Sequence, residues 1–295
     1  VERAGQISNF QKEKYFNVEL DCDGIPAVKP KIFDPDEAEQ LRSRCQGSEA
    51  IVTAVKETEK KVKAPKLYDL TTLQREANRI YGMTAKQTLD TAQSLYEKKL
   101  ITYPRTDSQY LTEDMEQTAR NVVRQIYEKY QLTGPFDQPE QLDVKKVMNN
   151  SKVTDHHAII PTMELASCHL DELKSWEEKI LFLIAVHTVM AMSKDHIYQE
   201  TEIEVECQGE IFKAKGRTVL QDGWKLFENC FKNKDRMAIV DPDQEMKERM
   251  PKVTQGQTFY AVAAEKTEHF TSPPKPYSED TLLAAMETAG NKEFD

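Results

Sequence analysis

The sequence has few of the features that mark secreted, nucleic-acid-coating or disordered proteins. Its five cysteines are odd in number and widely spaced, and no Cys-x-x-Cys pair is present. This usage argues against a disulfide framework or a zinc site and predicts reduced thiols in a cytoplasmic protein. Basic residues number 40 against 50 acidic ones, so the net charge of −10 excludes a histone-like coat and confines any nucleic-acid contact to a local patch. Glycine is scarce and 39% of residues are hydrophobic, as in ordinary globular chains.

Long hydrophobic runs are also missing. The most apolar segment, residues 180–192, is shorter than the ~20 residues that a bilayer requires, and it contains His187. We therefore expect a buried helix at this position and no membrane partner.

Hydrophobic periodicity changes twice along the 295 residues, which are enough for two domains. Alternation typical of strands occurs at 15–20 and 49–63 and returns after Tyr198, whereas helical spacing prevails in between. We predict an α+β fold, in which a mainly helical domain is inserted into an arched antiparallel β domain. The expected divisions are 1–65 with 193–272 for the β (arch or hinge) domain, 66–192 for the helical domain, and 273–295 for the start of a further, truncated segment.

Local signals place several elements within this outline. Thr84 and Gln87 form a capping box that opens a helix, and Ser175 with Glu178 form a second one. The first helix should turn one face inward, and turns are expected at Asp23-Gly24 and Gln208-Gly209, with a strand at 257–268. The inward residues of the first helix are Leu89, Ala92, Leu95 and Tyr96.

The stretch "ITYPRTDS" places Tyr103 directly before Pro104. A residue that precedes proline is pushed out of the helical region, so Tyr103 is expected to be extended. Side chains two apart in an extended chain point the same way, roughly 6 to 7 Å apart. Tyr103 and Arg105 should therefore face one side together.

This pair suits chemistry on a phosphodiester. A phenol forms a phosphodiester product that is stable and readily reversed, and a guanidinium can hold the phosphate oxygens as negative charge builds. Asp107 is a candidate to orient Arg105, while Thr106 to Ser108 suit a turn or helix cap. Taken alone, such a triplet is more often a surface or packing element.

Two adjacent histidines occur in "TDHHAIIPT". In an extended chain His156 and His157 face opposite sides, so a shared metal ion or proton is not favoured, and the spacing is wrong for a zinc helix. One of them can reach a phosphate as a hydrogen-bond donor or proton carrier, while the other packs or caps.

These motifs, with "LYDLTTLQREANRIYGMTAKQTLDTAQSLYEKKL" and "TSPPKPYSEDTLLAAMETAGN", resemble type IA DNA topoisomerases, and bacterial DNA topoisomerase III most of all. The resemblance covers most of the chain in the same order. It implies an ATP-independent enzyme that cleaves one DNA strand through a 5′-phosphotyrosine, passes another strand and reseals. Tyr103 matches the family's nucleophile, Arg105 the arginine that steadies the scissile phosphate, and His156 a histidine near the DNA backbone. His157 and Asp107 are the further candidate DNA-binding residues.

The resemblance also implies a missing part. The family's Toprim domain binds Mg²⁺ through an acidic cluster, and no counterpart is present; Asp21-x-Asp23 is interpreted as a hairpin turn. We therefore expect a central fragment that carries no cofactor and is inactive alone, with its magnesium ligands in the missing N-terminal domain. The implied partners are single-stranded DNA and possibly a helicase.

Three alternatives to this family differ in the residues that they require. A relaxase-type nuclease needs two histidines that flank one apolar residue, and "DHHA" lacks that spacing. A tyrosine recombinase needs several arginines around its tyrosine, and that set is not identified. The remaining alternative is a module that binds nucleic acid or a protein partner without catalysis.

Overall fold

The computed structural model describes residues 2–132, 138–228 and 251–289. Its described residues form two compact units. A sheet unit contains 2–61, 197–221 and 251–276, and a helical unit contains 62–132, 138–196, 222–228 and 277–289. Cys230 lies outside the described residues, and the other four cysteines are free thiols.

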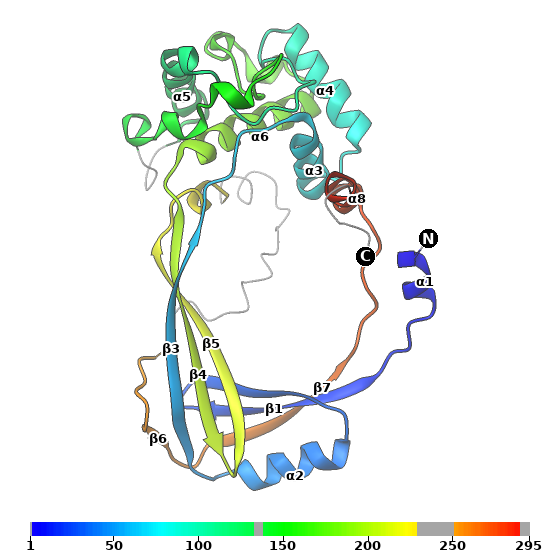
Figure 1. Ribbon diagram of the computed structural model, residues 1–295, viewed down its shortest axis with the longest axis vertical. Coiled ribbons are helices and arrows are strands. Elements are labelled where there is room, and N and C mark those ends of the chain that lie inside the picture. The colour runs from blue at the N-terminus through cyan, green and yellow to red at the C-terminus, as the bar shows by residue number, and fades with distance from the viewer. Residues whose placement is uncertain (1, 133–137, 229–250, 290–295) are drawn as a thin grey trace. The chain divides into compact units, whose positions relative to one another are not determined.

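The sheet unit is built on one seven-stranded sheet with the strand order β6-β3-β4-β5-β2-β1-β7 (Figure 1). Val28 of β2 pairs with Lys213 of β5, so segments far apart in the sequence share this sheet. The recorded pairings of β1 with β2 and β7, β2 with β5, β3 with β6, and β4 with β5 are all antiparallel. The strands are β1 (Lys14–Cys22), β2 (Ile25–Ile32), β3 (Ala50–Val62), β4 (His196–Cys207), β5 (Glu210–Gln221), β6 (Thr258–Phe259) and β7 (Ala263–Phe270).

Alternation of side chains explains how these strands bury one face. Every second residue of β1 from Phe16 to Cys22 is buried, and the sheet core includes residues of α2 (Pro35–Cys45), whose N-terminus is capped by Asp34. The N-terminal helix α1 (Glu2–Ser8) has no buried residue. The predicted turn at Asp23-Gly24 is confirmed, because both residues have positive φ and Asp21 Oδ1 accepts the Gly24 N–H at 2.6 Å. Asp21 thus serves a hairpin, as interpreted from the sequence.

The second predicted turn is also confirmed, but the last predicted strand is interrupted. Gln208 and Gly209 have positive φ and connect β4 to β5. The strand expected at 257–268 is split into β6 and β7, with Ala261 at φ 53° between them. The break arises because the backbone of Val262 bonds instead to Gly47 and Ser48, directly after α2.

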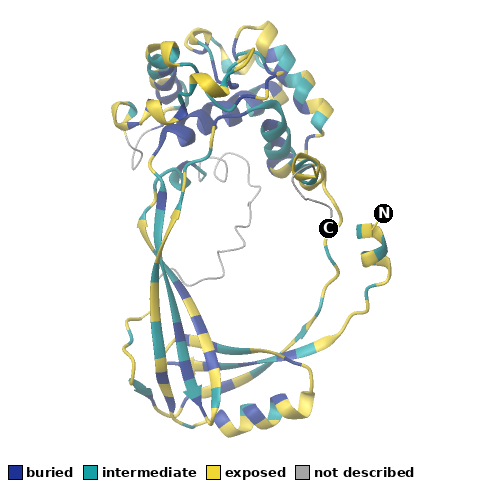
Figure 2. Ribbon diagram, viewed as in Figure 1, coloured by how far each residue is buried: buried dark blue, intermediate teal, exposed yellow. Residues whose placement is uncertain are grey.

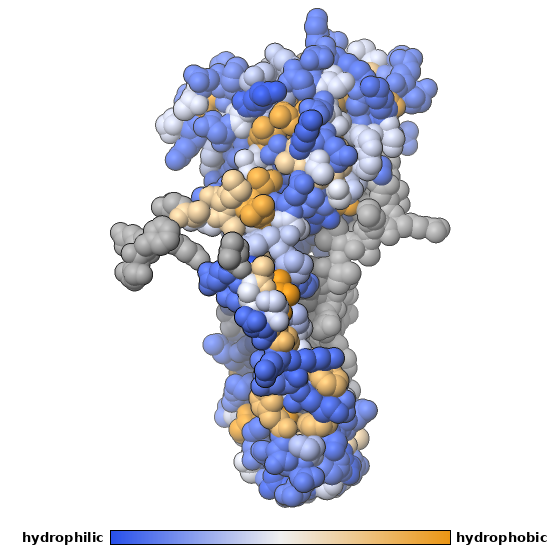
Figure 3. Space-filling view, turned by 90° about the vertical axis from the view of Figure 1, so that its right-hand side faces the viewer, coloured by the Kyte–Doolittle hydropathy of each residue, from blue (hydrophilic) through white to orange (hydrophobic). Residues whose placement is uncertain are grey.

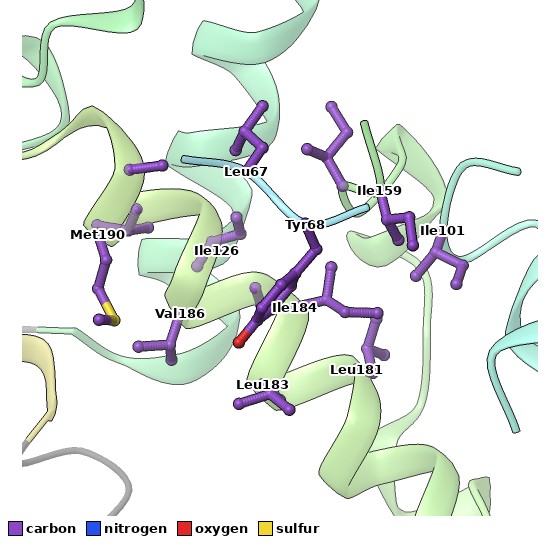
Figure 4. Close-up of a cluster of buried hydrophobic side chains, with 14 of the residues drawn as sticks. Leu67, Tyr68, Ile101, Ile126, Ile159, Leu181, Leu183, Ile184, Val186 and Met190 are labelled. Atoms are coloured by element: carbon purple, nitrogen blue, oxygen red, sulfur yellow. The ribbon is translucent and has the colours of Figure 1, made fainter. Parts of the chain in front are cut away.

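The helical unit packs around α6 (Ser175–Met192). All residues from 180 to 192 are buried, as the dark ribbon in Figure 2 shows, so the predicted buried helix is confirmed. Figure 4 shows Leu183, Ile184 and Val186 of this helix around the ring of Tyr68. No helix in the described part of the chain is long and apolar enough to cross a membrane. The other helices are α3 (Leu70–Tyr81), α4 (Ala85–Glu97), α5 (Glu116–Tyr130) and α8 (Glu279–Thr288), with short 3-10 turns between them.

Helix starts follow the predicted capping in one case and shift in the other. The capping box of Thr84 and Gln87 is present at the start of α4. At α6 the helix begins at Ser175, and the carboxylate that accepts the Lys174 N–H belongs to Glu177, not Glu178. Glu177 also accepts from Ser94 Oγ at 2.7 Å and Lys98 Nζ at 2.5 Å, so contacts across helices select this residue.

Of the four residues predicted to face inward from α4, Ala92 and Leu95 are buried, whereas Leu89 is only half-buried and Tyr96 is exposed. The buried stripe of α4 consists of Thr88, Ala92 and Leu95, whereas Tyr96 is 39% exposed. Each helical residue turns by about 100°, so Tyr96 lies just beyond the stripe that Leu95 ends.

Helix α8 rests on α3 through charged and polar groups. Arg75 bonds to Asp280 at 2.9 Å and to Glu287 at 3.1 Å, and Asn78 Oδ1 accepts the Asp280 N–H. No residue of α8 is buried, and its Leu282 and Met286 are exposed. Figure 3 shows hydrophobic patches among the mainly hydrophilic surface on this side of the molecule. Residues 277–289 therefore group with the helical unit, although the sequence suggested that a further segment starts at 273. The predicted fold class, helices inserted into an antiparallel sheet domain, is confirmed.

Candidate active site

Two irregular segments of the helical unit run antiparallel and bring the predicted site residues together. Thr102 N donates to Ile160 O and Thr162 N donates to Leu100 O, both at 3.0 Å. Further along, Thr106 Oγ1 donates to His156 O at 3.0 Å. These bonds set the register in which Tyr103 lies beside His156, fifty-three positions later in the chain.

Exposure alternates along the segment that contains the tyrosine. Pro104, Thr106 and Ser108 are buried, whereas Tyr103 is half-buried and Arg105 and Asp107 are exposed. This period of two is that of an extended chain, and it places the odd-numbered side chains on the accessible side. The arrangement agrees with the expectation that Tyr103 and Arg105 share one side.

The ring of Tyr103 is held between two other rings. Its centroid lies 4.4 Å from that of His156, with the planes at 44°, and 5.3 Å from that of Tyr96, with the planes at 76° in a T-shaped arrangement. Within the described ranges, no hydrogen bond involves the Tyr103 hydroxyl. The phenolic oxygen is therefore free to contact a ligand.

Arg105 and Asp107 make no ion pair with each other. No hydrogen bond or salt bridge of either side chain is recorded within the part of the chain that the structure describes, so the suggested orientation of Arg105 by Asp107 is not present. The exposed guanidinium of Arg105 is left to bind an anion with its forked donors, two residues from a free phenol.

The two histidines occupy different surroundings. His156 is exposed and contacts the ring of Tyr103. His157 is half-buried, and its Nδ1 lies 2.9 Å from the carbonyl oxygen of Ala158, to which it donates when Nδ1 is protonated. Of the two histidines, only His156 makes a recorded ring contact with Tyr103.

The site residues do not form a metal centre. Over residues 2–132, 138–228 and 251–289, no group of three or more His, Cys, Asp or Glu side chains is arranged to hold a metal ion. The side chains that contact the Tyr103 ring, those of Tyr96 and His156, carry no carboxylate that could bind a magnesium ion.

A second polar cluster lines a pocket of about 360 Å³ in the helical unit. The Tyr68 hydroxyl donates to Glu76 at 2.5 Å, and the buried His187 ring stacks on Tyr68 at 3.7 Å. His187 Nε2 donates to Lys66 O at 2.7 Å, which leaves Nδ1 3.5 Å from the Glu76 carboxylate without a hydrogen bond. None of Tyr103, Arg105 and His156 lines this pocket, so it is separate from the candidate site.

His187 should make the helical unit sensitive to acid. Burial lowers the pKa of His187 below its ordinary value, so the folded protein resists a proton that the unfolded chain takes up near pH 6.5. The contribution of neutral His187 to the free energy of unfolding is thus fully present above pH 6.5. It is lost as the pH falls towards the pKa of His187 in the folded protein, by up to about 1.4 kcal/mol per pH unit. We expect His187→Gln to flatten this slope.

Urea unfolding at pH 7 and pH 5.5 checks this expectation. The two tryptophans, Trp176 and Trp224, both lie in the helical unit, so their fluorescence reports that unit alone. A pH slope that is the same in the wild type and in His187→Gln would show that other groups carry it.

Comparison with known proteins shows the family to which the chain belongs. A family model described as DNA topoisomerase matches residues 1–290. The DNA topoisomerase 3 of Bacillus licheniformis is 36% identical over 303 aligned positions, and that of Bacillus subtilis is 35% identical over 299; each alignment covers 97% of this chain. The solved structure of full-length topoisomerase I from Thermotoga maritima matches 98% of the chain and 46% of its own, with a TM-score of 0.71 and 25% identity. The chain spans about 40% of the length of the two Bacillus relatives.

Proposed function

The chain belongs to the DNA topoisomerase family, and on this premise we propose that it is the part of a type IA enzyme that supplies the nucleophile, Tyr103. The observation that carries the proposal is the Tyr103 side chain, whose ring contacts that of His156 and whose hydroxyl has no hydrogen bond within the described residues. Arg105, for which no ion pair is found within the same residues, is exposed two positions away. The substrate is single-stranded DNA.

The reaction is an exchange of one phosphodiester for another. Tyr103 Oη attacks phosphorus, the bond from phosphorus to the 3′-oxygen breaks, and a 5′-phosphotyrosyl link replaces it. The phenol loses its proton and the departing 3′-oxygen gains one, so a free 3′-hydroxyl remains. Attack by this hydroxyl on the phosphotyrosine reverses the step, and no ATP is required.

Arg105 and His156 have different roles in this reaction. The Arg105 guanidinium binds the non-bridging oxygens as negative charge increases in the transition state. The imidazole of His156, in contact with the Tyr103 ring, donates a hydrogen bond to the same phosphate or carries a proton. Asp107 and His157 remain candidate DNA contacts at the edge of the site.

Four further points stay predictions. They are passage of a second strand, assistance by Mg²⁺ from ligands outside this chain, inactivity of the chain alone, and a helicase partner. The alternative function, a module that binds nucleic acid or protein without catalysis, makes no covalent product. A covalent adduct therefore separates the two functions.

End-labelled single-stranded oligonucleotides test the proposal in the intact protein. A 5′-phosphotyrosyl link keeps the downstream fragment on the protein, so a 3′-end label should remain with the protein in a denaturing gel and a 5′-end label should not. The opposite pattern of labels would contradict the proposed chemistry, and the absence of any adduct would favour the binding module.

The two histidines should respond differently to substitution. His156→Ala should slow adduct formation, because it removes the ring that contacts Tyr103, whereas His157→Ala should change the rate less, because its Nδ1 lies against a neighbouring carbonyl. Single-turnover cleavage rates of the two variants provide the comparison. Equal losses would remove the reason for assigning His156 to the site.

A further inference from the structure

Tyr96 contacts the proposed nucleophile but has no part in the chemistry described above. It lies in the last turn of α4, the residue is 39% exposed, and its ring packs edge-to-face with that of Tyr103 at a centroid distance of 5.3 Å. No hydrogen bond to the Tyr96 hydroxyl is recorded within the described residues. The ring, and not the hydroxyl, is therefore what Tyr96 presents to Tyr103.

A nucleophilic phenol raises a problem of orientation. A hydrogen bond to the hydroxyl would fix the side chain but would also occupy the oxygen that must attack. Within the described residues the Tyr103 hydroxyl makes no such bond, so contacts along the ring have to hold it. The recorded ring contacts are with Tyr96 and His156.

The two residues that make these contacts lie in elements of different regularity. His156 is the last residue of a bend in an irregular segment and is exposed. Tyr96 stands on α4, which begins at a complete capping box and is anchored by the buried Ala92 and Leu95. Edge-to-face contact at 4.5 to 7 Å is a favourable geometry for aromatic pairs. Tyr96 thus supplies the contact that comes from a regular, anchored element.

We propose that Tyr96 is a positioning residue whose ring holds Tyr103 in the orientation that presents Oη to the scissile phosphate. The inference rests on the proposed function of Tyr103. Rotation about the first side-chain bond moves the phenolic oxygen by several ångströms, and a displacement of about 1 Å at a reacting centre can cost ~10²-fold in rate.

Two substitutions in the intact protein separate the ring from the hydroxyl. Tyr96→Leu removes the aromatic ring, and Tyr96→Phe keeps it. At a saturating oligonucleotide concentration, we expect Tyr96→Leu to slow single-turnover cleavage about 10-fold or more. We expect Tyr96→Phe to cleave within about 2-fold of the wild type, because only the unused hydroxyl is lost.

Binding and folding measurements complete the test. The Kd for an uncleavable oligonucleotide should stay the same in Tyr96→Leu, since positioning affects the rate and not the affinity. Tryptophan-monitored unfolding should also be unchanged, because Tyr96 is partly exposed and fills no core position. Trp176→Leu, which removes another exposed aromatic ring of the same unit, should cleave at the wild-type rate.

The possible results distinguish failure of the positioning role of Tyr96 from failure of the proposed function of Tyr103. Cleavage by Tyr96→Leu at the wild-type rate overturns the positioning role. A weaker Kd for Tyr96→Leu with an unchanged rate at saturation overturns it as well, and so does a loss of cleavage rate in Tyr96→Phe equal to that in Tyr96→Leu. The proposed function survives each of these results as long as Tyr103→Phe forms no adduct. If Tyr103→Phe still forms adduct, the proposed function fails, and this inference fails with it.

Discussion

Tyr103→Phe is expected to abolish the covalent protein–DNA adduct while folding and DNA binding stay close to those of the wild type. The substitution removes one oxygen, and that oxygen has no hydrogen bond within the described residues, so nothing in the fold depends on it. The ring contacts with His156 and Tyr96 remain available. The measurement is denaturing-gel detection of adduct on a labelled oligonucleotide, with a binding titration alongside.

Tyr110→Phe is the matched control for this loss. Tyr110 is half-buried and lies seven residues later in the same segment, yet no hydrogen bond to its hydroxyl is recorded in the described ranges. It should form adduct like the wild type. Adduct at wild-type levels from Tyr103→Phe would refute the mechanism.

Arg105→Ala is expected to reduce the cleavage rate by ~10²-fold or more, with the nucleophile intact. Removal of one preorganised charged donor at the developing negative charge typically has an effect of this size. Arg105→Lys should recover only part of the loss, because a point charge does not reproduce the planar fork of a guanidinium. Since no ion pair of Arg105 is recorded in the described residues, these changes should leave the stability of the fold unaltered.

Arg124→Ala provides the comparison for Arg105. Arg124 is half-exposed on α5 of the same unit, and it pairs with Glu140 at 3.3 Å. Loss of this surface arginine should leave single-turnover cleavage unchanged. Similar losses from Arg105→Ala and Arg124→Ala would indicate a general electrostatic effect on DNA binding.

Much of the fold is predictable because its signals are local. The Asp23-Gly24 and Gln208-Gly209 turns, the alternation of β1 and the capping box of α4 each depend on residues a few positions apart. Errors occur where distant groups compete for the backbone or a side chain. Val262 bonds to the turn after α2 and interrupts a strand, and Glu177 replaces Glu178 at a helix start because Ser94 and Lys98 also bind it.

In the candidate site too, local features are predictable from the sequence and long-range contacts are not. Proline after Tyr103 predicts the alternation that exposes Arg105, and this prediction needs only the local sequence. The closeness of His156 to Tyr103 comes from tertiary hydrogen bonds between two irregular segments, for which no periodicity exists; only the family resemblance pointed to it. Tyr96 was missed because helical spacing assigned it to the core. Its position seven residues before Tyr103, at the end of the helix that leads into the site, was the available signal.

The most direct test of the central claim is to map the covalent link. The intact protein is trapped on an oligonucleotide, digested with protease and nuclease, and analysed by mass spectrometry. The account predicts a residual nucleotide joined through its 5′-phosphate to the peptide that contains Tyr103, together with a free 3′-hydroxyl on the released strand. A nucleotide attached to any other residue, or a link through a 3′-phosphate, would contradict it.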